Sequence, residues 1–119
     1  MTNKDLFPII NDYLQTKLGS KKEFPFGDEP AVFKVGGKMF ALLAQKKEPL
    51  RLTLKCDPLE IDIVRMTFAA VNPGYHMNKD HWNTITLDGS MPNEILFAMI
   101  DDSYDLILSG LSKRIRESI

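Results

Sequence analysis

The sequence predicts an α+β domain in which helices cover one face of an antiparallel sheet, in the order α-β-β-β-α-β-β-α. Three observations support this class. Two β-rich runs flank a Gly-Gly pair, residues 50–56 alternate strictly between apolar and polar types, and both ends of the chain carry apolar residues at helical spacing. Strands that are joined by short turns pair antiparallel, and helices then cover one side of the sheet.

The first helix is predicted to begin at Thr2 or Asn3, either of which can cap it, and to stop at Gly19. Its apolar side chains recur at steps of three and four residues: Leu6, Phe7, Ile10, Tyr13, Leu14 and Leu18. Residues 19–30 then form a loop, whose Phe24-Pro25-Phe26-Gly27 segment is aromatic enough to pack back onto the domain.

A β-hairpin follows, because Gly36-Gly37 suits the positive φ angles of a tight turn between strands 31–35 and 38–43. This register predicts three opposite pairs: Lys38 with Val35, Lys34 with Met39, and Phe40 with Phe33. In the third strand, residues 50–56, alternation separates a core face from a solvent face. The core face holds Leu50, Leu52, Leu54 and Cys56, and the solvent face holds Arg51, Thr53 and Lys55.

The second helix is predicted to open at Asp57-Pro58 and to run to about residue 69 or 70, with Asn72-Pro73-Gly74 ending it. It should bury some of its apolar residues: Leu59, Ile61, Ile63, Val64, Met66 and Phe68. Residues 75–77 are predicted as a short strand and residues 81–87 as a longer one, with Asn78-Lys79-Asp80 as their turn. Trp82, Thr84 and Thr86 should share one face of the longer strand, and Ile85 and Leu87 the other.

The last helix is predicted to open at Pro92 and to break at Gly110, before a basic tail. Its apolar stripe is Ile95, Leu96, Met99, Ile100, Tyr104, Ile107 and Leu108. Residues 1–119 are expected to form one domain, since this length holds a single continuous core. A content of 44% hydrophobic and 26% charged residues is ordinary for a soluble protein, and no apolar run is long enough to span a membrane. Cys56 is the only cysteine, and a reducing cytoplasm is therefore the expected compartment.

The charges are unevenly distributed although the net charge is only −1. Residues 33–56 hold six basic residues against one acidic residue, a local balance of +5. Residues 84–105 hold five acidic residues and no Lys or Arg, a balance of −5. We therefore expect an electrically two-sided molecule, and not a protein that coats nucleic acid through its overall charge.

Residues 73–82 are predicted to form a recognition surface, because they gather both histidines, the only tryptophan, a lysine and a tyrosine around one turn. A metal site is not expected, since His76 and His81 stand five residues apart without the ligand spacing of a closed site. No cofactor loop or catalytic motif is found, and Cys56 is expected to pack and not to attack a substrate. We therefore expect a binding protein and not an enzyme.

The ligand is expected to be anionic. If strands 50–56 and 81–87 belong to one sheet, Arg51 and Lys55 share its uncovered face with Trp82, whose alternation with threonines favours exposure. Two ligand classes fit: DNA, whose phosphates would meet the basic residues, or a small anionic ligand or acidic protein segment held in a pocket. The oligomeric state is not predicted.

Several motifs resemble the MmcQ/YjbR-like family of small bacterial proteins. They are Val32-Phe33-Lys34-Val35-Gly36-Gly37-Lys38-Met39-Phe40-Ala41, Leu52-Thr53-Leu54-Lys55-Cys56-Asp57-Pro58, Pro73-Gly74-Tyr75-His76-Met77-Asn78-Lys79, His81-Trp82, Leu87-Asp88-Gly89 and Ile100-Asp101-Asp102-Ser103-Tyr104-Asp105-Leu106. The resemblance covers residues 24–111 and implies a fold similar to the secretion-chaperone-like and CyaY-like group.

For function, the resemblance implies a double-wing DNA-binding domain. The wings would be the Gly36-Gly37 hairpin and the Asn78-Lys79-Asp80 turn. The contact residues that it implies on this sequence are Lys34, Lys38, Lys55, His76, Lys79, His81 and Trp82, to which alternation adds Arg51.

Overall fold

The computed structural model describes residues 3–74 and 77–119 and confirms the α+β class. Its elements are α1 (Asn3–Thr16), β1 (Lys21–Glu23), β2 (Ala31–Val35), β3 (Lys38–Ala44), β4 (Leu50–Lys55), α2 (Ile61–Thr67), β5 (Val71–Pro73), β6 (Trp82–Leu87), α3 (Asn93–Ser109) and α4 (Lys113–Glu117). Two of them extend the predicted order: β1 lies in the loop before the hairpin, and α4 lies in the basic tail. No helix in the described part of the chain has both the length and the apolar character to cross a membrane.

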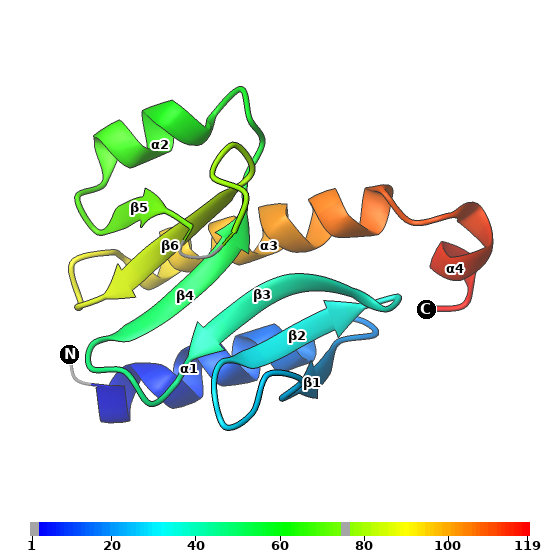
Figure 1. The fold of residues 1–119 in the computed structure, drawn as a ribbon, viewed down its shortest axis with the longest axis horizontal. Coiled ribbons are helices and arrows are strands. Elements are labelled where there is room, and N and C mark those ends of the chain that lie inside the picture. The colour runs from blue at the N-terminus through cyan, green and yellow to red at the C-terminus, as the bar shows by residue number, and fades with distance from the viewer. Residues whose placement is uncertain (1–2, 75–76) are drawn as a thin grey trace.

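One sheet organises the domain, with the strand order β1-β2-β3-β4-β6-β5 and antiparallel pairing throughout. Figure 1 shows α1 and α3 behind this sheet, while α2 lies by the edge that β5 and β6 form. No helix of the described residues covers the opposite face. That face is therefore the surface on which exposed strand residues can meet a ligand.

The hydrophobic core lies between the sheet and the two long helices. The helix stripes supply Leu6, Ile10 and Leu14 from α1, and Leu96, Ile100 and Tyr104 from α3, all of them buried. Phe40 stands at the centre, with its ring 5.3 Å from that of Tyr104 and perpendicular to it, a favourable edge-to-face contact. The apolar residues that alternate along the strands thus pack against the apolar stripes of the two helices, as the sequence predicts.

The Gly36-Gly37 hairpin forms as predicted, with φ angles of 57° and 82° that favour glycine. Lys38 lies opposite Val35 and Lys34 opposite Met39, but the predicted pairing of Phe40 with Phe33 is wrong, because Phe33 lies opposite Ala41. The register shifts between Phe33 and Lys34, which is the signature of a β-bulge. The extra residue in β3 allows Phe40 and Ala41 both to be buried.

The segment after the second helix differs from the prediction. The helix ends at Thr67, and Val71–Pro73 forms the edge strand β5, with Val71 opposite Ile85. Proline is tolerated there because an edge strand needs no N–H on its outer side. The predicted strand 75–77 is not found at Met77, and residues 75–76 lie outside the described residues.

The antiparallel order brings distant segments to one end of the sheet, which we call the Gly36 end. β2 ends there and β3 begins there, because the Gly36-Gly37 turn joins them. β4 also ends there at Lys55, opposite Trp82, where β6 begins. Both predicted wings therefore stand at the same end of the sheet, with the end of β4 between them (Figure 1).

Adjacent carboxylates on α3 have opposite electrostatic surroundings. Asp101 accepts hydrogen bonds from the Tyr13 hydroxyl and the Lys17 ammonium of α1 and its following turn, both at 2.7 Å. Burial opposes ionisation of Asp101, but these two hydrogen bonds and the Lys17 charge outweigh it and lower its pKa. Burial raises the pKa of Asp102, and repulsion by Asp105 and Asp101 adds to the increase.

We expect Asp101→Asn and Asp102→Asn to change stability in opposite directions at pH 7. Asp101→Asn should lower the free energy of unfolding by about 1 kcal/mol, a modest value because this pair is partly exposed. Asp102→Asn should raise it, because folding disfavours the Asp102 charge. The loss in Asp101→Asn should disappear as the pH falls through the low folded pKa of Asp101, and the gain in Asp102→Asn should fade once Asp102 is protonated. Urea unfolding across this pH range checks both signs, and a loss of stability in Asp102→Asn at pH 7 would contradict the assignment.

Candidate functional site

The predicted strand face exists and is built from β4 and β6. Three cross-strand pairs lie on it: Lys55 with Trp82, Thr53 with Thr84, and Arg51 with Thr86. The opposite face of the same strands carries Leu52 and Ile85, which are buried under the helices. Arg51 is exposed, whereas Lys55 and Trp82 are half-buried. Lys55 and Trp82 are therefore neighbours on the uncovered face, and this pair forms the centre of the candidate site.

The position of Lys55 depends on Ser103, which is fully buried in α3. The Ser103 hydroxyl donates to the carbonyl of Phe40 at 2.6 Å and accepts from the backbone N–H of Lys55 at 2.9 Å. It bridges β3 and β4 just beyond Ala41 and Leu54, the last residues that pair directly. Sequence reasoning missed this residue, although a serine within the apolar stripe of α3 was a visible signal.

The turn between β5 and β6 is fastened by Arg65 of α2. Its guanidinium donates to the Asn83 side chain at 2.7 Å, to the Trp82 carbonyl at 3.2 Å, and to the Lys79 carbonyl. Gly74 closes the base of the turn by donating its N–H to the Trp82 carbonyl at 2.8 Å. A Cβ at Gly74 would stand 2.9 Å from that of Trp82, so the close approach requires glycine. Arg65 was also missed, although it is the only basic residue between positions 57 and 72.

Lys79 and His81, two further predicted residues of this turn, differ in their exposure and in their hydrogen bonds. Lys79 is exposed, and its ammonium donates to the Gly74 carbonyl at 3.2 Å, so it is partly occupied by its own turn. The carbonyl of His81 accepts from the Cys56 N–H at 2.8 Å and extends the β4–β6 pairing. The Nδ1 atom of His81 is buried and has no hydrogen-bond partner in residues 3–74 and 77–119. His76 lies outside the described residues.

Lys34 and Lys38 flank the hairpin turn at the same end of the sheet. Lys34 pairs with Glu23 at 3.6 Å, which compensates part of its charge, whereas Lys38 is exposed. Helix α4 packs beside this turn, because a Cβ at Gly36 would stand only 2.6 Å from Leu111 and 2.9 Å from Ile115. The basic residues of α4 therefore join the Gly36 end: Lys113, Arg114 and Arg116. No local pattern in the sequence indicates this contact, which depends on how the tail folds back.

The structure thus brings most of the predicted residues to one end of the sheet, but not into one pocket. Arg51 is the exception, since it lies at the start of β4, about 13 Å from Lys55 by the rise of a strand. It lines a separate groove on the uncovered face, with a volume of about 1020 Å³. This groove has polar walls and floor from Lys47, Arg51, Thr53, Asn72, Thr84, Thr86 and Glu29, and apolar parts from Phe26, Pro30, Leu42, Ala44, Pro73 and Met77.

The surroundings of Cys56 disfavour the ionised form of its thiol. Burial raises the pKa of the Cys56 thiol, and the charges of Glu60, Asp57 and Asp102 raise it further. The thiol is therefore held in its protonated and weakly nucleophilic form. Within the described part of the chain, no three His, Cys, Asp or Glu side chains are close enough together to hold a metal ion.

Comparison with known proteins places this fold among a set of bacterial relatives. The YjbR family model matches residues 15–106. The uncharacterized protein YbdF of Escherichia coli O157:H7 is 37% identical over 91 residues, which is 76% of this chain and 75% of that protein. The uncharacterized protein YjbR of Escherichia coli K12 is 28% identical over 105 residues, or 88% of this chain and 89% of that protein.

Solved structures agree with this grouping. The crystal structure of Deinococcus radiodurans protein DR2400, with the domain DUF419, superposes with a TM-score of 0.88 at 38% identity, covering 94% of this chain and 86% of that chain. A crystal structure of a protein from Pseudomonas syringae gives a TM-score of 0.73 at 29% identity, covering 84% of this chain and 97% of that chain.

Proposed function

The chain belongs to the YjbR family, and on that premise we propose that it is a nonenzymatic, cytoplasmic domain that binds double-stranded DNA at the Gly36 end of its sheet. The observation that carries the proposal is the cross-strand pair of Lys55 and Trp82 on the uncovered face, between two turns that bear Lys38 and Lys79. A duplex is a regular array of phosphates, and it suits cations that are spread along an edge better than a closed pocket would.

The charge distribution of the strands supports this proposal. None of the strands β2 to β6 contains Asp or Glu, whereas α3 behind the sheet carries Glu94, Asp101, Asp102 and Asp105. The strand residues are therefore basic overall although the net charge of the chain is −1, and their cations would face a phosphate backbone at the Gly36 end. The basic residues of α4 beside Gly36 extend the same cationic surface.

Each group would have a distinct role in the complex. Lys38, Lys55 and Lys79 would neutralise phosphates, and the two turns would follow the backbone on either side of a groove. The half-buried Trp82 would present one edge of its indole to a sugar or base. Backbone contacts of this kind fix the position of a duplex and carry little sequence information, so weak sequence preference is expected.

We expect binding that weakens steeply with salt. If Lys38, Lys55, Lys79 and one basic residue of α4 each neutralise one phosphate, the affinity for a duplex of about 20 base pairs should fall roughly a hundredfold between about 50 mM and 200 mM salt, because each contact releases condensed counterion. Fluorescence anisotropy titrations at these two salt concentrations measure the slope. Absence of binding at the lower concentration, or an affinity that does not change with salt, would refute the proposal.

A second candidate is the binding of a small anionic ligand or an acidic protein segment in the groove that contains Arg51. The groove favours this function because Lys47 and Arg51 stand beside the paired hydroxyls of Thr53 and Thr84, whose oxygens are 2.9 Å apart. Thermal shift measurements with phosphorylated metabolites and with an acidic peptide test it. A shift that Arg51→Ala abolishes and Lys55→Ala retains would assign the ligand to the groove and not to the Gly36 end.

A further inference from the structure

Helix α2 and its leading turn expose an apolar stripe. Leu59, Ile63 and Met66 are 93%, 65% and 85% exposed, and their spacing of four and three residues places them on one side of the helix and its leading turn. Ile61, which faces the sheet, is 4% exposed. The sequence predicts burial for part of this set, and no element of the described residues covers the stripe.

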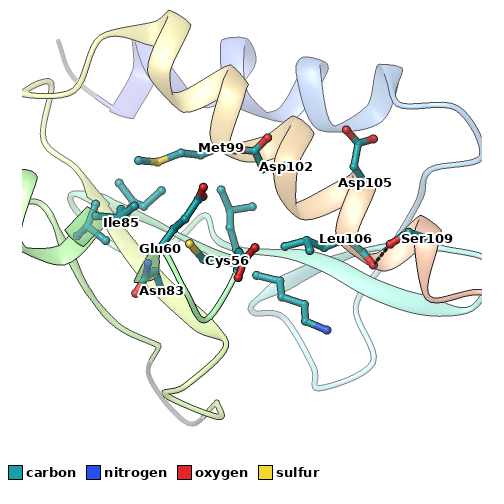
Figure 2. Close-up of a pocket in the computed structure, with 14 residues that line it drawn as sticks. Cys56, Glu60, Asn83, Ile85, Met99, Asp102, Asp105, Leu106 and Ser109 are labelled. Carbon is teal, nitrogen blue, oxygen red and sulfur yellow. Dashed lines mark hydrogen bonds between the residues drawn. The ribbon is translucent and has the colours of Figure 1, made fainter. Parts of the chain in front are cut away.

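A cavity of about 470 Å³ lies beside this stripe, between α2 and α3. Its apolar lining comes from Leu54, Val64, Val71, Ile85, Met99 and Leu106. Its acidic lining comes from Asp57, Glu60, Asp102 and Asp105. Figure 2 shows Glu60 extending toward Met99 and Asp102 of α3, so that carboxylates of two different elements face one space. Glu60 is also the residue that follows Leu59, and it links the cavity to the stripe.

These four carboxylates form no salt bridge within 4.0 Å in the part of the chain that the structure describes. The ion pairs found there involve Asp101, Glu23, Asp28, Asp62 and Glu117 instead. Lys55 lines the cavity but forms no ion pair with them. The raised pKa values of Asp102 and of the Cys56 thiol, for which burial is the largest cause, also report nearby carboxylates. The cavity therefore combines apolar walls with four carboxylates, against Lys55 as the one basic residue of its lining.

We propose that this α2–α3 surface, consisting of Leu59, Glu60, Ile63, Met66, Asp102 and Asp105, docks a segment of a partner protein that carries apolar side chains along one side and Lys or Arg beside them. Charge complementarity selects this chemistry, because a Lys or Arg places a cation at the carboxylates while its methylene stem packs on apolar walls. The apolar residues of the segment would cover the stripe, as amphipathic helices do in other grooves. The proposal does not depend on DNA binding, because it leaves the roles of Lys38 and Lys79 unchanged and its ligand is a peptide.

Two synthetic peptides of about 18 residues provide the probe, a length sufficient for helix formation on binding. Both carry Leu at the same helical positions, and one has Lys where the other has Glu. With the full chain and a fluorescent label on the peptide, anisotropy is expected to report saturable binding of the Lys peptide and none of the Glu peptide. If the Lys peptide does not bind at concentrations up to about 1 mM, the range of weak transient contacts, the proposal is overturned.

Paired variants locate the binding. Ile63→Ser/Met66→Ser removes the stripe, Glu60→Gln/Asp102→Asn removes the charge, and each should weaken binding of the Lys peptide about tenfold or more. Leu18→Ser/Phe26→Ser and Glu94→Gln/Glu117→Gln are the matched controls, because Leu18 and Phe26 are 70% and 63% exposed, Glu94 and Glu117 are exposed, and none of them lines the cavity. Equal affinity in the site variants and the controls would show unspecific attraction and overturn the proposal.

A second copy of this chain is the alternative occupant of the α2–α3 surface, and a measurement of self-association tests it. If sedimentation without peptide shows a dimer that Ile63→Ser/Met66→Ser dissolves, the surface is covered by a second copy of this chain, and the proposal for a different partner is wrong. A monomer that binds the Lys peptide supports it.

Discussion

Replacement of Lys38 and Lys55 by alanine is expected to weaken duplex DNA binding about a hundredfold at about 50 mM salt, because two phosphate contacts are lost and their counterions are no longer released. The slope of log affinity against log salt should become shallower by about 2. Lys38 is exposed and Lys55 is half-buried, and neither forms an ion pair in the described residues, so their removal should leave the fold intact. Anisotropy titrations over a salt series measure both effects.

The matched control is Lys4→Ala/Lys46→Ala, which changes the net charge of the chain by the same amount. Lys4 lies on α1 behind the sheet, and Lys46 lies in the β3–β4 turn at the end of the sheet opposite Gly36. This control should bind DNA within about twofold of the unmodified chain. If both double variants lose the same affinity, binding depends on overall charge, and the Gly36 end is not the site.

Ser103→Ala is expected to have the largest effect on stability among single polar substitutions, a loss of about 3 kcal/mol in the free energy of unfolding. The substitution leaves the Phe40 carbonyl and the Lys55 N–H without the partner that bridges them, and an unsatisfied buried polar group costs about 1 to 3 kcal/mol. Urea unfolding followed by circular dichroism measures the change.

Ser109→Ala provides the comparison on the same helix. The Ser109 hydroxyl donates to the Leu106 carbonyl at 3.0 Å, but Ser109 is exposed and water can replace it, so the change should be within about 0.5 kcal/mol. Similar stability of the two variants would show that Ser103 does not connect β3 to β4 energetically. A selective loss in Ser103→Ala would tie the position of Lys55 to the packing of α3.

Local pattern predicted the parts of the fold in which neighbouring residues decide the structure. The Gly36-Gly37 turn follows from glycine geometry, and the two faces of β4 and β6 follow from periodicity. The predicted break of α3 at Gly110 is also confirmed, although Gly110 has a φ of −83° that any residue can adopt. The shift at Phe33 did not follow, because a bulge depends on which side chains the core can accept from both strands. The edge strand β5 was missed because its pairing with β6 outweighs the turn preference of Asn72 and Pro73.

The candidate site was likewise predicted in part. Alternation placed Arg51, Lys55 and Trp82 on one face, which the register of β4 and β6 confirms. Alternation predicts which face of a strand a residue occupies, but not how far along the strand it lies. It therefore could not show that Arg51 is distant from the Gly36 end. It also gave no sign that Arg65 would cross from α2 to hold the turn of Lys79.

The sequence by itself determined the α+β class, the hairpin, the sidedness of the central strands and the separation of basic strands from acidic helix, because each depends on residue types at short spacing. Only the tertiary structure decided that α4 lies against Gly36, that Ser103 joins β3 to β4, and that α2 leaves its apolar stripe exposed next to a cavity lined by carboxylates. These contacts join residues that are distant along the chain. Their stability comes from packing and from satisfied buried polar groups, which a local pattern does not encode.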